Sequence, residues 1–255
     1  MKSIDTNLER TEQYLKTFNR EKVIKYLVKD ENPIIFDVGA NDGVSASEFK
    51  KYWPNSIIHC FEPQKECWKD LDKLEKTYMD KSIIVNKCAT GNISNKEAPF
   101  YTHDITTGQS GFNKINMESI DSIHLKKIKK NRNQFLDYNN SVNHERIVEI
   151  IRLDNYMVTN NINNISLLKI DTQGFEPEVL EGLGEKLCNI DIVITELMFY
   201  DYYDRCLSFS DIENYLLPAN FKLYDISHIS KNPMNGRTDW VDVIYLNNRV
   251  RKNIK

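Results

Sequence analysis

The stretch from Ile34 to Gly43, IIFDVGANDG, decides the fold. Three apolar residues lead into a polar turn that holds two glycines, and a run with helical spacing follows from Val44 to about Tyr52. This order predicts a strand, a tight turn and a helix. In an open α/β sheet such a junction binds a nucleotide-like cofactor, because glycine lets a ligand approach the backbone and the helix N-terminus offers free N–H groups.

The spacing of the glycines separates two classes of cofactor. Gly39 and Gly43 are four residues apart, and Asn41 stands where a dinucleotide-binding G-x-G-x-x-G turn has its second glycine. That glycine lets a pyrophosphate come close, so its absence argues against NAD or FAD and favours a cofactor without phosphates. A plain turn that binds no ligand is the alternative.

The composition is that of an ordinary globular chain. Its 255 residues, 40% of them hydrophobic, can bury a sizeable core in one domain. The 34 basic and 37 acidic residues give a formal net charge of -3, which does not favour a nucleic-acid partner. The five cysteines form no C-x-x-C pair, so neither a zinc site nor a disulfide framework is indicated. We find neither an apolar run of the signal-peptide type nor one long enough to span a membrane, so we expect a cytoplasmic protein with reduced thiols.

We expect a single domain over residues 1–255. Residues 1–32 are predicted to form an N-terminal helical extension, because their apolar residues fall at helical spacing and Pro33 then admits the first strand. Residues 104–145 are predicted to be an insertion or lid near the active site. They include a basic run at 126–132, interpreted as a solvated helix face, with a patch that attracts an anionic substrate as the alternative.

Two further strands are predicted to carry cofactor contacts. A strand over residues 56–61 ends at Glu62, 23 residues after Gly39, where a carboxylate can accept hydrogen bonds from both hydroxyls of a ribose. A third strand ends at Cys88 and Ala89, which would flank an adenine beside the first strand. A surface glutamate and a buried, inert cysteine are the alternatives.

A buried strand that ends in charged residues is the second informative stretch, LLKIDTQGFE over residues 167–176. Lys169 and Asp171 lie two residues apart, so they point to the same face of the strand. Charges inside an apolar strand are costly unless they are paired or used. Glu176 opens the next helix, with Pro177 in its favoured first turn. The strand tip is therefore predicted to carry the chemistry, and a salt bridge that only orients the turn is the alternative.

Two loops are predicted to lie near the same edge of the sheet. The loop over residues 106–112 places Gln109 and Ser110 between two glycines, as in a lid, a substrate contact or a simple turn. The segment over residues 197–203 is dense in aromatics and includes Tyr200. It is either a platform for a sugar ring or the core of the following helix.

The remaining strands complete the predicted sheet. An apolar strand over residues 190–195 ends in Glu196. Strands over residues 220–227 and 239–247 flank a turn at 232–236, so they are predicted to pair antiparallel.

With these residues identified, the sequence resembles the FkbM-type S-adenosylmethionine (SAM)-dependent methyltransferases. The motifs that carry the resemblance are FDVGANDG at 36–43, CFEP at 60–63, GQSGF at 108–112, IRLDNY at 151–156 and LLKIDTQGFEPEVLEG at 167–182. The resemblance is strong over residues 33–200 and looser over 239–247. It implies a class I methyltransferase fold, a Rossmann-like α/β three-layer sandwich whose seven-stranded, mostly parallel sheet has an antiparallel last strand.

The resemblance also implies methyl transfer from SAM, usually to a hydroxyl oxygen of a sugar in a surface polysaccharide or glycolipid, or of a secondary metabolite. We expect a small-molecule or glycan acceptor, no nucleic acid and no membrane span, and a homodimer is compatible with the sequence. The predicted cofactor contacts are Asp37, Gly39, Ala40, Asn41, Gly43, Glu62, Cys88 and Ala89. The predicted substrate contacts are Gln109, Ser110, Gln173, Glu176 and Tyr200.

Asp171 is predicted to be the catalytic base or to hold the acceptor hydroxyl, with Lys169 setting its orientation and Glu196 completing the polar pocket. No metal is favoured, and the option is Mg²⁺ held by Asp171, Glu176 and Glu196. Two other functions stay open: an RNA or protein methyltransferase of the same fold, supported only by the basic run, and a non-catalytic SAM-binding protein.

Overall fold

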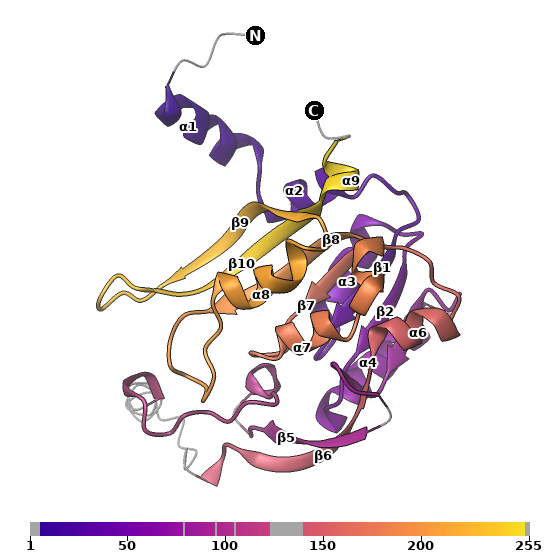
Figure 1. Ribbon diagram of the computed structural model, residues 1–255, viewed down its shortest axis with the longest axis vertical. Helices are drawn as coiled ribbons and strands as arrows, with labels where there is room; N and C mark the ends of the chain where they lie inside the picture. Colours follow the sequence, from indigo (N-terminus) through magenta and orange to yellow (C-terminus); the bar gives the residue numbers. More distant parts are fainter. Residues whose placement is uncertain (1–5, 79, 95, 105, 123–139, 253–255) are drawn as a thin grey trace.

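A seven-stranded sheet forms the centre of the computed structural model, which describes residues 6–78, 80–94, 96–104, 106–122 and 140–252 (Figure 1). Its strand order is β3, β2, β1, β7, β8, β10, β9. The strands are β1 (Ile34–Val38), β2 (Ile57–Phe61), β3 (Ile83–Asn86), β7 (Ile165–Ile170), β8 (Ile190–Met198), β9 (Phe221–Lys231) and β10 (Thr238–Asn247). Strand β10 runs antiparallel to β8 and β9, and the other neighbours run parallel. The predicted mostly parallel sheet with an antiparallel end is therefore confirmed.

Helices cover both faces of this sheet and give the predicted three-layer sandwich. One face packs against α2 (Arg20–Leu27), α3 (Val44–Tyr52) and α4 (Lys65–Thr77). The other face packs against α6 (Leu153–Thr159), α7 (Glu176–Glu181) and α8 (Phe209–Leu216). Figure 1 shows α7 and α8 in front of the sheet and α3 behind it. Because side chains alternate along a strand, Ile35 of β1 packs into the core on the α3 side and its neighbour Phe36 packs on the other side, against Tyr156 of α6.

The register of the parallel strands brings their carboxyl ends to one edge. Val38 pairs with Phe61 on one side and with Ile170 on the other, and Ile170 pairs with Thr195. The next residues along these four strands are Gly39, Glu62, Asp171 and Glu196. Residues spread over more than 150 positions of the chain are thus collected in one line, which is where open α/β sheets bind their ligands.

A second, three-stranded sheet lies beside this edge; the sequence indicates strands over residues 98–103 and 146–153, but their pairing into a sheet was not predicted. It consists of β4 (Ala89–Thr90), β5 (Lys96–Thr102) and β6 (His144–Ile151), in the order β4, β6, β5. Strands β5 and β6 pair antiparallel, and they flank most of the predicted insertion at 104–145. The basic run at 126–132 lies outside the described residues, so its predicted role stays a prediction.

The two N-terminal helices differ in how many residues they bury. Helix α1 (Asn7–Thr17) buries no residue and projects away from the rest of the structure (Figure 1). Helix α2 buries Val23, Ile24 and Leu27 against the sheet. The remaining short elements are the 3-10 helices η1 (Thr107–Gln109) and η3 (Gly184–Asn189) and the C-terminal helix α9 (Asn248–Arg251). Within the described ranges, none of the helices combines the length and the apolar character that crossing a membrane requires.

Candidate active site

A first cavity lies at the carboxyl ends of β1, β2 and β7. Its free space, including its open mouth, is about 530 Å³. The predicted residues in its lining are Gly39, Asn41, Glu62, Ala89, Ser110, Asp171 and Gln173. The lining residues that were not predicted are Val38, Phe61, Pro63, Gln64, Thr90, Phe100, Thr107, Gly108, Phe112 and Thr172.

The glycine turn after β1 allows the tip of β7 to lie in close contact with its backbone. Gly39 has φ +73°, and a Cβ there would lie 1.9 Å from the backbone oxygen of Asp171. Only glycine fits this contact between the tips of β1 and β7. Asn41 also adopts a positive φ of 47°, which asparagine tolerates better than most residues, and this aims its N–H at Glu62.

Four of the predicted cofactor contacts do not line the first cavity. Gly43 is the residue just before α3 and has φ +83°. A Cβ at this position would lie 2.7 Å from Leu74 of α4, so glycine is required here by the packing of the helices. Ala40 is buried in the core on the same side of the sheet. Asp37 is fully buried beside Lys169. Cys88 is buried in the core on the opposite side, and burial raises the pKa of its thiol to about 12.

Glu62 is held in place at the end of β2. Its Oε2 accepts a hydrogen bond from the N–H of Asn41 and its Oε1 accepts one from the N–H of Gln64, both at 2.8 Å. The side chain is almost fully buried, and this burial raises its pKa to about 7 although the two hydrogen bonds act in the opposite direction. Each carboxylate oxygen keeps a lone pair, which suits a pair of neighbouring hydroxyls.

The loop that was predicted to touch substrate closes one side of the first cavity. The Thr107 hydroxyl donates to Asn41 Oδ1 at 2.7 Å, and Gln64 Nε2 donates to the Thr107 carbonyl at 3.0 Å. Ser110 lines the cavity, whereas Gln109 does not: its Oε1 accepts a hydrogen bond from the Tyr202 hydroxyl at 3.0 Å. The loop is thus anchored both to the glycine turn and to the aromatic tip.

The aromatic tip after β8 serves mainly as core. Tyr202 and Tyr203 are buried in a small cluster with Ile115. The Tyr203 hydroxyl lies 2.8 Å from Gln173 Oε1, so the tip also steadies the turn after β7. Tyr200 does not line the first cavity.

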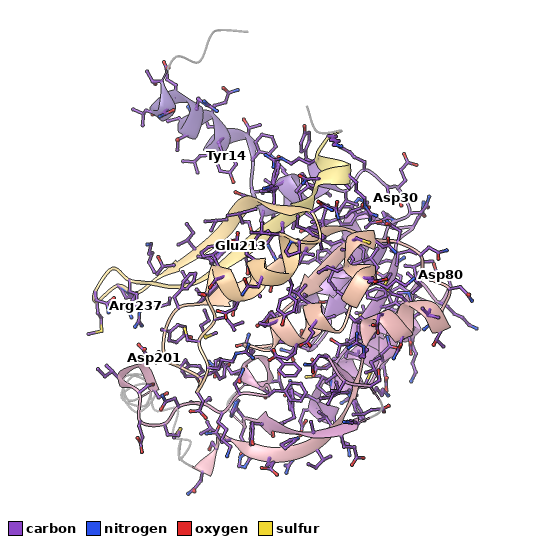
Figure 2. All side chains as sticks on the ribbon, in the orientation of Figure 1. Tyr14, Asp30, Asp80, Asp201, Glu213 and Arg237 are labelled. Carbon is purple, nitrogen blue, oxygen red and sulfur yellow. The ribbon has the colours of Figure 1, made fainter. Side chains whose placement is uncertain are left out.

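The guanidinium group of Arg237 lies 5.6 Å from the centre of the Tyr200 ring. Figure 2 labels Arg237 on the hairpin between β9 and β10. The same side chain forms ion pairs with Asp121, at 2.7 Å, and with Asp239, at 3.0 Å. These contacts tie the hairpin to the segment before residue 123 and to the tip of β8.

A second cavity opens on the α2 and α3 side of the same strand tips, with about 540 Å³ of free space including its mouth. The predicted catalytic residues Lys169, Asp171 and Glu196 all line it. The other residues in its lining are Arg20, Ser45, Ile170, Ile194, Thr195, Trp240 and Asp242. Asp171 alone is common to the linings of both cavities.

Two side chains orient the carboxylate of Asp171. Gln173 Nε2 donates to its Oδ1 at 2.8 Å, and Lys169 Nζ donates to its Oδ2 at 3.4 Å. The same ammonium group lies 3.3 Å from Oδ1 of the buried Asp37. Burial lowers the pKa of Lys169, but the carboxylates of Asp37 and Asp171 outweigh it and raise that pKa overall, so the lysine stays charged.

The two glutamates near Asp171 differ in what they contact. Glu176 Oε1 accepts hydrogen bonds from the N–H and the hydroxyl of Thr172, so it fixes the turn and lines neither cavity. Glu196 lines the second cavity, and burial together with Asp171 and Asp242 raises its pKa to about 9. Within the described ranges, no group of three or more His, Cys, Asp or Glu side chains is arranged to hold a metal ion.

The first cavity fits SAM better than a cofactor with phosphates. Its lining includes the carboxylates of Glu62 and Asp171 and, among the residues described, neither lysine nor arginine that would neutralise a phosphate. SAM carries a ribose diol that matches Glu62 and a positive sulfur that a carboxylate stabilises. This lining agrees with the missing second glycine of the turn.

The strand order and the cavity at the tips of β1 and β2 define a class I methyltransferase. A family model described as the methyltransferase FkbM domain matches residues 37–223, and the chain therefore belongs to that family. The family and the fold together identify the chain as a SAM-dependent methyltransferase.

Three known proteins show the range of the similarity. The 2-O-methyltransferase NoeI of Sinorhizobium fredii (strain NBRC 101917 / NGR234) is 24% identical over 197 residues, 76% of this chain and 74% of that one. Methyltransferase 1 of Beauveria bassiana (strain ARSEF 2860) is 25% identical over 173 residues, 66% of this chain and 65% of that one. The crystal structure of methyltransferase FkbM from Methylobacillus flagellatus KT superposes with a TM-score of 0.50 at 13% identity. That match covers 85% of this chain and 44% of the solved chain, and it shows the fold alone.

The pKa of Glu62 leads to a prediction about ligand binding. Ribose hydroxyls bound at Glu62 would donate to its ionised carboxylate, so binding would favour the charged form. Affinity for adenosine is therefore expected to be highest above about pH 7 and to fall as the pH drops, by up to about tenfold per pH unit. Calorimetric titration between about pH 5.5 and about pH 8.5 measures this, because adenosine has no group that titrates in that range.

The matched control is Glu62→Gln, which keeps the shape of the side chain but cannot ionise. It should bind adenosine more weakly than the wild type and with a flat pH profile. A flat profile in the wild type would show that the Glu62 carboxylate does not receive the ribose.

Proposed function

We propose that the protein transfers the methyl group of SAM to a hydroxyl oxygen of a small-molecule or glycan acceptor, such as a sugar of a surface polysaccharide, a glycolipid or a secondary metabolite. The observation that carries the proposal is the position of Asp171. Its carboxylate, held by Lys169 and Gln173, stands between a cavity that fits SAM and a second polar cavity.

The chain's own residues supply the help that a hydroxyl needs. When bound, SAM supplies a methyl group on a positive sulfur, which leaves as a neutral thioether. A hydroxyl is a weak nucleophile until its proton is removed, and in this proposal Asp171, which lines both cavities, takes that proton. Residues that line the cavities hold the reacting groups in order, and such alignment alone is worth several kcal/mol of the barrier.

A relative also supports transfer to oxygen. The curated name of NoeI describes a 2-O-methyltransferase, and this chain covers 74% of that relative. The second cavity is lined by carboxylates and by Trp240, which are groups that contact hydroxyl-rich ligands well.

The test is an assay with methyl-labelled SAM and three kinds of acceptor: neutral and charged glycosides, RNA, and protein. We expect label in the glycoside fraction, as a methyl ether identified by mass spectrometry. Label in RNA or protein instead would support the alternative methyltransferase functions. In a parallel reaction with a chelator, activity is expected to persist, and its loss would show that the reaction requires a metal, as in the Mg²⁺ option at Asp171, Glu176 and Glu196.

A further inference from the structure

The second cavity and the first meet at one side chain. Asp171 lines both, and the tips of β7, β8 and β10 form the floor of the second cavity. A methyl acceptor has to reach Asp171 from the side that the cofactor leaves free. The second cavity provides such an approach, on the face of the sheet that α2 and α3 cover.

Strand register places three carboxyl groups side by side on this floor. Glu196 of β8 is the direct partner of Asp242 of β10. Ile170 pairs with Thr195, so Asp171 and Glu196 are the next residues along the two strands. Side chains at such neighbouring positions lie about 5 Å apart on one face, where like charges repel. Nothing in the packing of an ordinary sheet requires this arrangement.

The cations that line the cavity are already paired. Arg20 of α2 lies 3.4 Å from Asp242, and Lys169 lies between Asp37 and Asp171. In the part of the chain that the structure describes, the side-chain carboxyl group of Glu196 has neither a hydrogen bond nor an ion pair. An anionic ligand would therefore find no free cation here, whereas a ligand with hydroxyl or amino groups would find carboxyl oxygens to bind.

An aromatic side wall completes the cavity. Trp240 lines it, and its ring is stacked on His228 with 4.6 Å between ring centres and 10° between planes. The stacking holds the indole in one orientation. A rigid aromatic face beside polar hydrogen-bonding groups suits a sugar ring, which has apolar C–H faces and a polar rim.

We propose that the second cavity binds the methyl acceptor, and that it selects a neutral or amine-bearing sugar over one that carries a carboxylate or phosphate near the reacting hydroxyl. The proposal rests on the proposed function, which it deepens by locating the acceptor and giving its charge class. Trp240 supports the ring, Glu196 binds its hydroxyl or amino groups, and the Arg20–Asp242 pair keeps anions out.

Ligand-detected NMR in the presence of S-adenosylhomocysteine tests the proposal without turnover. The probes are a panel of neutral methyl glycosides and the matching methyl glycuronosides. In the wild type, at least one neutral glycoside is expected to bind about tenfold more tightly than its glycuronoside. Trp240→Ala should weaken that binding about tenfold. Asp242→Asn frees Arg20 from its partner, so it should bring the glycuronoside to within about threefold of the neutral sugar.

The control substitution is Asp70→Asn on the exposed surface of α4, which should change neither preference nor affinity. Melting temperature and affinity for S-adenosylhomocysteine show that each variant is folded with an intact first cavity. The proposal is overturned if no neutral glycoside binds, if glycuronosides bind better, or if Trp240→Ala and Asp242→Asn both leave binding unchanged. Methyl transfer to a non-sugar hydroxyl, unaffected by Trp240→Ala, would keep the proposed function and overturn this inference alone.

Discussion

Asp171→Asn is expected to lower the turnover number by about 10²- to 10⁴-fold, the usual contribution of a general base. The substitution keeps the size of the side chain, and its oxygen can still accept from Gln173 Nε2. Asparagine cannot take the proton of the acceptor hydroxyl, so the loss should appear in turnover. Steady-state kinetics with labelled SAM measures it, and calorimetry should find SAM affinity within about threefold of the wild type.

Two variants show whether such a loss is specific to the carboxylate. Gln173→Leu removes a donor that orients Asp171, so it should cost about tenfold in turnover, less than Asp171→Asn. Asp201→Asn makes the same chemical change at an exposed position and should leave turnover unchanged (Figure 2). Turnover of Asp171→Asn within about threefold of the wild type would remove Asp171 from the role of base.

The parts of the site that could be predicted are those in which a strand and its turn are contiguous in sequence. The β1 tip shows its apolar run and its glycines within ten residues, IIFDVGANDG, and a run with helical spacing follows directly. The distance from Gly39 to Glu62 is the length of one turn, one helix and one strand, so the carboxylate could be placed at the neighbouring tip. Both residues line the first cavity.

A motif does not reveal which of its members touch a ligand. Gly39 and Gly43 look equivalent in sequence, but the first lies at the cavity and the second makes room for Leu74 of α4. Asp37 looks like a polar contact of the same turn, yet its carboxylate is buried beside Lys169, its partner on β7. In both cases the contacting residue, Leu74 for Gly43 and Lys169 for Asp37, comes from a distant part of the chain that the motif does not contain.

Contacts between remote segments could not be predicted. The pairing of β5 with β6 joins Thr102 to His144, and the second cavity joins Arg20 of α2 to Asp242 of β10. One signal for the cavity was present: Trp240 and Asp242 lie two residues apart in a largely apolar strand, the pattern that singled out Lys169 and Asp171. The same reasoning applied to β10 would have placed both side chains on one face.

Lys169→Met is expected to destabilise the fold by about 3–5 kcal/mol, because it leaves Asp37 as a buried carboxylate without its cation. Urea denaturation of the ligand-free protein measures this loss. Burial raises the pKa of Asp37 above its unfolded value, so the folded state of the variant holds a proton that the unfolded chain releases. The destabilisation should therefore be smallest near the unfolded pKa and grow as the pH rises through the folded pKa.

The double variant Asp37→Asn/Lys169→Met decides whether charge, and not lost packing, causes that loss. Without the carboxylate there is no unpaired charge to bury, so the double variant should recover most of the stability that Lys169→Met loses. Lys87→Met, which removes a half-exposed ion pair with Asp72, should cost less than about 1 kcal/mol. If the double variant is as unstable as Lys169→Met, the lysine acts through packing alone. If it recovers stability but not turnover, the ion pair supports the fold while Lys169 separately orients Asp171 for the reaction.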